Sequence, residues 1–193
     1  LEGAFYSTTN YSRPIFNFFR EEETLDLDSL LKPLSEEDEN TVLKDTNLLS
    51  IKTNREYQSN KKPTTSTNQI ATSLFQRDRL KFILRYAFAY VEEENGLEKH
   101  VMRYPQLFAT KAIEARLELG IKKGIIWHTQ GSGKTALAFF NVKHLTHYYR
   151  KKNIIPKFYF IVDRLDLLTQ AAKEFTARGL VVHKIDSRDD FSK

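Results

Sequence analysis

The fold is decided by Gly124-Ile125-Ile126-Trp127-His128-Thr129-Gln130-Gly131-Ser132-Gly133-Lys134-Thr135, in the second half of a 193-residue chain. Its first four residues form a short apolar run typical of a buried strand, and a helix is predicted from about Lys134 to Lys151. Between them, glycines let backbone N–H groups curve around an anion, and the start of the helix offers further unpaired N–H groups. Strand, loop and helix in this order predict a loop that binds nucleotide phosphates.

Lys134 and Thr135 are the candidate catalytic residues of this loop. In such loops the lysine reaches the β- and γ-phosphates and the threonine hydroxyl binds Mg²⁺, so ATP and Mg²⁺ are the expected cofactors. The general pattern has a glycine where this chain has His128, and the alternative interpretation is a Gly-Ser surface turn before an ordinary helix. The candidate nucleotide-binding residues of the loop are Gln130, Gly131, Ser132, Gly133, Lys134 and Thr135, with Thr135 also the candidate metal ligand.

Two further apolar runs follow the loop in a repeated strand–helix pattern. Residues 158–162 and 180–183 are predicted strands, separated by a helix at about 165–178. Alternating strands and helices predict right-handed crossovers and an α/β fold with a partial RecA-like parallel sheet. Residues 73–193 are therefore interpreted as the amino-terminal part of a P-loop NTPase lobe, truncated at its end.

The sequence ahead of the loop divides into helical and polar stretches. A helix is predicted over residues 105–119, and an earlier one is expected to stop at Asn95-Gly96. Residues 21–72 are interpreted as an acidic, polar connector with one short helix at 25–31, and residues 1–20 are rich in aromatic side chains. The earlier predicted helix carries Leu80, Leu84, Ala87 and Val91 at helical spacing.

Charge is unevenly distributed along the chain. Residues 21–50 contain ten acidic and two basic side chains, a net charge of −8, which leaves +13 for the remainder. A basic body favours a polyanion such as nucleic acid, although a solvated basic face with no partner is an equal alternative. The absence of cysteine and of a long apolar run predicts a cytoplasmic protein with no membrane partner. His144 and His147 are interpreted as surface polar residues rather than a metal pair.

Three segments resemble one family. Residues 127–135 resemble motif I of the motor (R, or restriction) subunit of type I restriction–modification enzymes, which typically reads His-Thr-Gln-Gly-Ser-Gly-Lys-Ser/Thr. Residues 103–109 resemble the adenine-reading segment of that family, which makes Gln106 a candidate nucleotide-binding residue; its alternative is a helix-opening glutamine without a ligand. Residues 160–170 resemble motif Ia, which makes Arg164 a candidate DNA-phosphate contact. The alternative for Arg164 is an ion pair with Asp166 at a helix start.

The resemblance implies a function for the full subunit. Such a subunit couples ATP hydrolysis to translocation along double-stranded DNA, cleaves DNA, and joins modification (methyltransferase) and specificity subunits. Residues 1–20 then represent the tail of an upstream nuclease domain. The acid string and arginine finger that complete an ATP site are expected beyond Lys193, so the fragment alone is expected to be inactive. The alternatives are another superfamily 2 DNA or RNA helicase, or a non-hydrolysing fragment that docks other subunits.

Overall fold

The computed structural model describes residues 4–7, 16–30, 33–62 and 65–185, without the side chains of 66–69. These residues form two compact units, and the boundary between the units falls after Phe82, within one helix. Tyr11, one of the aromatic residues noted in the sequence, lies outside the described residues. Among the described residues, no helix is long and apolar enough to cross a membrane.

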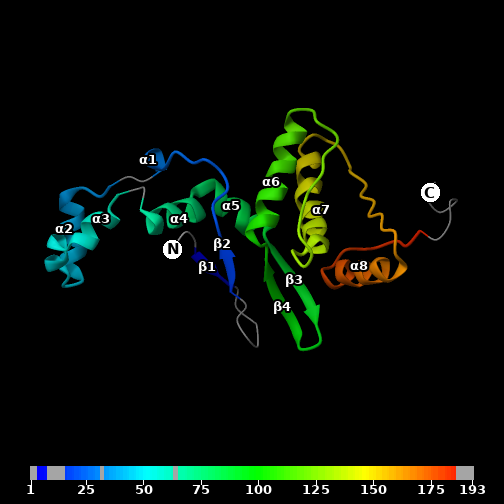
Figure 1. Ribbon diagram of the computed structural model, residues 1–193, viewed down its shortest axis with the longest axis horizontal. Helices are drawn as coiled ribbons and strands as arrows, with labels where there is room; N and C mark the ends of the chain where they lie inside the picture. The colour runs from blue at the N-terminus through cyan, green and yellow to red at the C-terminus, as the bar shows by residue number, and fades with distance from the viewer. Residues whose placement is uncertain (1–3, 8–15, 31–32, 63–64, 186–193) are drawn as a thin grey trace. The chain divides into compact units, whose positions relative to one another are not determined.

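The first unit combines a small sheet with a series of short helices. In the sheet, β1 (Ala4–Tyr6) pairs antiparallel with β2 (Asn17–Phe19), and Phe19 is buried. Residues 21–72, predicted to be a connector with one short helix, contain several helices. The helices, coloured blue to green in Figure 1, are α1 (Leu27–Leu30), α2 (Glu36–Asp45), the 3₁₀ helix η1 (Leu49–Thr53), α3 (Arg55–Asn60), α4 (Ser66–Phe75) and the start of α5 (Arg77–Tyr86).

The acidic residues of α2 are placed where a helix favours them. Ser35 is the N-cap, and its hydroxyl accepts a hydrogen bond from the backbone N–H of Asp38 at 3.1 Å. All four residues 36–39 are acidic, and negative charge in a first turn interacts favourably with the helix dipole. Composition alone suggested a solvated connector here, whereas the acids of residues 36–39 open a capped helix.

A β-hairpin replaces the second half of the predicted helix at 80–91. Helix α5 ends at Tyr86, and β3 (Phe88–Glu93) pairs antiparallel with β4 (Gly96–Val101). Buried Ala89 and Val91 alternate with exposed Tyr90, which is the period of a strand with one covered face. The prediction of a helix through Val91 is therefore wrong: Asn95 lies in the hairpin turn and Gly96 begins β4, so the pair does not stop a helix.

Three longer helices of the second unit lie close to their predicted positions. They are α6 (Tyr104–Glu118), α7 (Lys134–Arg150) and α8 (Leu165–Ala177). Each ends in the same way: a left-handed residue follows the helix, and the next N–H bonds back to the carbonyl five residues earlier. The left-handed residues are Gly120, Asn153 and Gly179, and the N–H groups of Ile121, Ile154 and Leu180 donate to the carbonyls of Arg116, Tyr149 and Phe175.

The three predicted parallel strands are not formed in the described part of the chain. Residues 124–127, 158–162 and 180–183 are extended but have no strand partner, and the two sheets present are antiparallel hairpin pairs. A parallel sheet requires paired neighbours and covered faces, yet Ile125, Trp127 and Val181 are between 84 and 91% exposed. The structure is thus mixed α and β, and its described residues do not show the predicted parallel sheet.

Candidate nucleotide-binding site

The loop between Trp127 and α7 has the backbone shape of an anion-binding loop. Gly131 has φ = 74° and Gly133, the N-cap of α7, has φ = 80°, a left-handed region that other residues rarely adopt. Within the described residues, the backbone N–H groups of Gly131, Gly133, Lys134 and Thr135 donate to no backbone or side-chain acceptor. Unpaired N–H groups at the start of a 17-residue helix are suited to bind an anion.

Lys134 folds back over this loop. Its Nζ donates to the backbone carbonyls of His128 at 3.1 Å and Thr129 at 2.9 Å. The Thr129 carbonyl also accepts the Ser132 hydroxyl at 2.7 Å. The side chain of Lys134 is exposed, and no carboxylate in the described part of the chain pairs with it. The ammonium group is therefore held by neutral acceptors at the place where the motif predicts phosphate binding.

Gln106 connects α6 to the same loop. Its Nε2 donates to the carbonyls of Gly133 at 2.9 Å and Ser132 at 3.4 Å, while its Oε1 accepts the N–H of Arg103 at 2.9 Å. Gln106 is 3% exposed, and a Cβ on Gly133 would lie 2.5 Å from Nε2. The side chain thus opens α6 and braces the phosphate loop at once, a contact that the sequence did not indicate.

Arg103 makes a second contact between α6 and the loop. Its guanidinium NH1 donates to the carbonyl of Gly131 at 3.3 Å. With Gln106, this places donors from the start of α6 on three successive carbonyls of the loop, those of residues 131–133. The sequence reasoning had treated Arg103 only as part of a resembling string. Because Arg103 and Gly131 are 28 residues apart in the chain, no local sequence pattern indicates this contact.

The other two predicted residues of the loop have no described side-chain bonds. Gln130 is exposed at the turn, and Thr135 lies half-buried in the first turn of α7. Thr135 is therefore located where its hydroxyl could reach a metal bound to phosphate. No group of three or more metal-ligating His, Cys, Asp or Glu side chains occurs among the described residues. A Mg²⁺ ion with few protein ligands is compatible with this, because Mg²⁺ commonly keeps several waters and binds substrate phosphates.

Arg164 is bound to a carboxylate at the start of α8. Its Nε and NH2 donate to Asp166 Oδ1 and Oδ2 at 3.2 and 2.6 Å. Both side chains are more than 60% exposed. The ion-pair interpretation is therefore what the structure contains, and no described contact joins Arg164 to the phosphate loop. Its role as a DNA contact stays a prediction.

A buried histidine of α7, His144, joins this helix to α6. His144 is 3% exposed, its Nε2 lies 3.0 Å from Glu114 Oε2, and its ring packs edge-on against Tyr86 at 4.6 Å. Burial lowers the pKa of His144 below its usual value, and the nearby carboxylate only partly opposes this. The interpretation of His144 as a surface residue is wrong: it helps fix α6 against α7, and so supports the placement of Gln106 beside the loop.

Part of the chain matches a known family profile. The family profile of SWI2/SNF2 ATPases matches residues 105–193, a range that contains Gln106, the phosphate loop and Arg164. More specifically, the chain is similar to endonuclease subunits of type I restriction enzymes. These similarities confirm the resemblance indicated by the motif strings, that of a fragment of a helicase-like restriction subunit.

The matching relatives come from archaea and bacteria. A Methanocaldococcus jannaschii protein, provisionally named type I restriction enzyme MjaVIIP endonuclease subunit, is 40% identical over 102 residues, covering 48% of this chain and 9% of the relative. A Staphylococcus aureus (strain COL) subunit, SauCOLORF180P, is 40% identical over 83 residues, covering 42% and 8%. A second M. jannaschii protein, provisionally named MjaVIIIP, is 32% identical over 129 residues, covering 62% and 12%.

The chain therefore spans only about a tenth of the length of the relatives that it matches. No solved structure shows a significant match to it.

Proposed function

We propose that this chain is the ATP-binding part of the motor subunit of a type I restriction enzyme. In the full subunit, ATP bound at residues 128–135 would drive translocation along double-stranded DNA, and the same protein would cleave DNA. One observation carries the proposal: at the start of α7, Lys134 and four unpaired N–H groups surround a loop with two left-handed glycines. The names of the relatives, endonuclease subunits of type I restriction enzymes, supply the biological context.

The residues fit a nucleoside triphosphate chemically. The N–H groups of Gly131, Gly133, Lys134 and Thr135 would donate to phosphate oxygens, as they do to no protein acceptor. Lys134 Nζ would exchange two neutral carbonyls for the charged oxygens of the β- and γ-phosphates, which accept stronger hydrogen bonds. The Thr135 hydroxyl would bind Mg²⁺.

Gln106 has a conditional role in this proposal. Its amide offers the donor and acceptor that adenine N7 and N6 require, but both of its polar atoms are already hydrogen-bonded to Arg103 and the loop. Reading adenine would therefore require Nε2 of Gln106 to give up one of its two loop carbonyls, the 3.4 Å contact to Ser132 being the weaker. Base recognition and the conformation of the phosphate loop would then be coupled through one side chain.

The remaining assignments belong to the whole subunit. We expect modification and specificity subunits as partners, a cytoplasmic location, and Arg164 as a contact to the DNA backbone once it is released from Asp166. We also expect residues 124–127, 158–162 and 180–183 to pair as parallel strands of a RecA-like lobe when partner strands are present. Their exposed apolar side chains support this expectation.

Binding of ATP by the chain tests the central claim. With a fluorescent ATP analogue and Mg²⁺, Lys134→Ala should weaken affinity roughly 10- to 100-fold, because charge-assisted hydrogen bonds contribute about 1.5–3 kcal/mol. The matched control is Lys173→Ala on α8, an exposed lysine with the same change of charge. Equal affinity of wild type and Lys134→Ala would contradict the proposal. ATP turnover by the chain alone, stimulated by DNA, would contradict its expected inactivity.

A related ATPase outside restriction is the second candidate. The SWI2/SNF2 family match is broader than restriction enzymes and covers the same motifs. The two candidates differ in their partners. Co-purification of the full-length subunit with methyltransferase and specificity subunits would favour the restriction enzyme, and failure to assemble with them would favour the other ATPase.

A further inference from the structure

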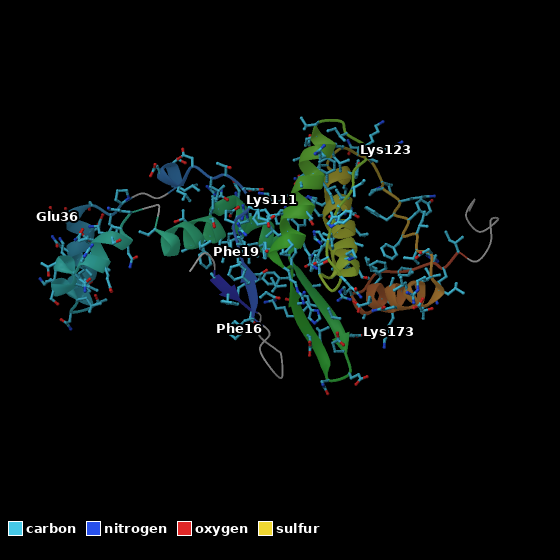
Figure 2. All side chains as sticks on the ribbon, in the orientation of Figure 1. Phe16, Phe19, Glu36, Lys111, Lys123 and Lys173 are labelled. Atoms are coloured by element: carbon cyan, nitrogen blue, oxygen red, sulfur yellow. The ribbon has the colours of Figure 1, made fainter. Side chains whose placement is uncertain are left out.

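The carboxyl-terminal ends of α6 and α7 lie side by side in the second unit. Figure 1 shows the two helices running together away from the β3–β4 hairpin. Glu118, the last residue of α6, has its Oε1 3.2 Å from Nζ of Lys152, just beyond α7. Figure 2 places Lys123 at this same end of the helix pair. Sequences that follow the two helices therefore emerge together.

The two emerging segments share a sequence pattern. Residues 122–126 read Lys-Lys-Gly-Ile-Ile and residues 151–155 read Lys-Lys-Asn-Ile-Ile. A left-handed residue lies near the end of each helix: Gly120 comes before Lys122-Lys123, and Asn153 comes directly after Lys151-Lys152. Two copies of one basic sequence pattern thus lie at one end of the helix pair.

Charge at this end is almost entirely positive. We call the following residues the basic helix ends: Arg116, Lys122, Lys123, Arg150 and Lys151, all exposed. Within the described residues none of them forms an ion pair; the one local carboxylate bonded to a lysine, that of Glu118, is bound by Lys152. One cation near each helix end is expected from the helix dipole, and Arg116 and Arg150 meet that need. Lys122, Lys123 and Lys151 add three positive charges beyond those that the helix dipoles explain.

The effect of this charge is visible at a neighbouring histidine. The pKa of His147, in the last turn of α7, is lowered chiefly by burial and then by the positive charges of Arg85, Lys151, His144 and Arg150. The charges facing His147 from the residues around it are thus basic. Acidic neighbours are too few to neutralise this end of the unit.

We propose that the basic helix ends bind the phosphate backbone of nucleic acid, at a surface separate from the nucleotide site. Helix α7 has 17 residues, so this surface lies about 25 Å from the phosphate loop along the helix. A mononucleotide bound at the loop cannot reach it, whereas a polyanion with regularly spaced phosphates can contact several cations at once. The proposal depends on the proposed function only in taking double-stranded DNA as the ligand.

An anionic membrane is the competing ligand, because isoleucines accompany the lysines. Those isoleucines have another use, since residues 124–127 are a predicted strand whose apolar side chains would be covered by sheet pairing. Sheet pairing gives no reason for the lysines. Nucleic acid is therefore favoured, and membrane binding becomes an outcome of the test.

The experiment measures binding of the chain to a fluorescent 30-base-pair duplex across a salt series. The variants are Lys122→Ala/Lys123→Ala and Arg150→Ala/Lys151→Ala, and the matched control is Lys173→Ala/Lys184→Ala, which removes the same charge elsewhere in the unit. Each test variant should reduce the salt slope by about 2, at about 0.9 per phosphate contact, and weaken binding at least about tenfold near 0.1 M salt. Affinity for ATP should stay at the wild-type value.

Four results would overturn this inference, three of them in the DNA-binding measurements. Those three are wild-type-like DNA binding by both test variants, a control that loses as much affinity as they do, or a wild-type chain that does not bind the duplex at low salt. Variants that lose binding to phosphatidylserine vesicles but keep DNA binding would overturn it in favour of a membrane. The nucleotide proposal is judged separately, because ATP binding by wild type and Lys134→Ala decides it whatever happens with DNA.

Discussion

The two units each contain a cation held by hydrogen bonds, and the two cations are satisfied differently. In the first unit, Arg79 is 1% exposed at its side chain and bonds Glu21 through two nitrogens at 2.7 and 3.1 Å. A third bond, at 2.8 Å, goes to Glu23. In the second unit, Lys134 is exposed and bonds only to backbone carbonyls among the described residues.

The difference lies in how each positive charge is compensated: Arg79 stabilises the first unit, whereas Lys134 is suited to bind an anion. The charge of Arg79 is neutralised by carboxylates from a segment more than 50 residues away, so its bonds close the first unit on itself. The charge of Lys134 has no counter-ion in the described part of the chain, and the nearby N–H groups are unpaired. An incoming anion gains most where the protein has left charge and donors uncompensated.

The largest expected effect on stability comes from removing Arg79 from its ion pairs with Glu21 and Glu23, which we call the closed cluster. Arg79→Met should lower the free energy of unfolding of the first unit by about 3–5 kcal/mol, because the buried carboxylate of Glu21 and the partly exposed one of Glu23 lose their cation. Chemical denaturation together with amide hydrogen exchange of β2 and α5 would measure this loss. ATP affinity of the second unit should change far less than the stability of the first.

A compensating variant distinguishes lost pairing from lost packing. Arg79→Met combined with Glu21→Gln and Glu23→Gln removes the uncompensated charges and should recover much of the stability. If the triple variant is as unstable as Arg79→Met alone, the ion pair is not what holds this region together.

An intermediate effect on stability and on ATP affinity is expected when the loop that carries Lys134, here called the open cluster, is changed at its two left-handed glycines. Gly133→Ala imposes a left-handed alanine and places its Cβ 2.5 Å from Gln106 Nε2, so the brace must shift. Gly131→Ala imposes similar backbone strain at φ = 74° but meets no atom within 4 Å. We expect a loss of about 1 kcal/mol for Gly131→Ala and about 2–3 kcal/mol for Gly133→Ala, read by thermal unfolding, with ATP affinity following the same order. Equal losses in the two variants would mean that Gln106 does not hold the loop.

The smallest effect concerns a second closed cluster, in α2 and α3. Hydrogen bonds from Lys61 and Tyr57 to Glu39, both at 2.7 Å, lower the pKa of that carboxyl from 4.5 to about 2. A lowered folded-state pKa means that the unfolded chain takes up the proton first. The resulting stability is therefore complete above about pH 4.5 and is lost as the pH falls towards 2.

Denaturation of wild type and Glu39→Gln between pH 6 and 2.5 measures this contribution. The variant should be less stable at pH 6, and the difference should shrink as the pH falls. A difference that stays constant over this range would show that folding does not lower the pKa of Glu39. Binding of ATP at pH 7 should be unaffected in either protein.

Local patterns in the sequence predicted the helices around the site well. Proline near the start and Gly120 after the end located α6, and the loop motif located the start of α7 at Lys134. These signals act through residues within a turn or two, so they can be read from sequence. The sequence located the loop, but the predicted site residues did not include His128 and Thr129, whose carbonyls Lys134 binds.

Features that depend on distant partners were missed. A strand at 124–127 requires neighbouring strands, and none pairs with it in the described residues, so apolar character alone predicted a sheet that the structure does not show. Strand β3 of the hairpin was read as a helix because Leu80, Leu84, Ala87 and Val91 fit a helical period, although the Ala89/Tyr90/Val91 alternation fits a strand. The brace by Gln106 and Arg103 spans 26 to 28 residues, beyond the range of any local pattern.

Trp127 is the chain's one tryptophan and is 91% exposed directly before the phosphate loop. It gives the protein a built-in optical reporter that needs no label. An exposed indole emits at long wavelength, and covering it shifts the emission to the blue. Because the next residue, His128, carries a carbonyl that Lys134 binds, the emission of this single ring would report two separate events: movement of the loop and burial of the strand segment that precedes it.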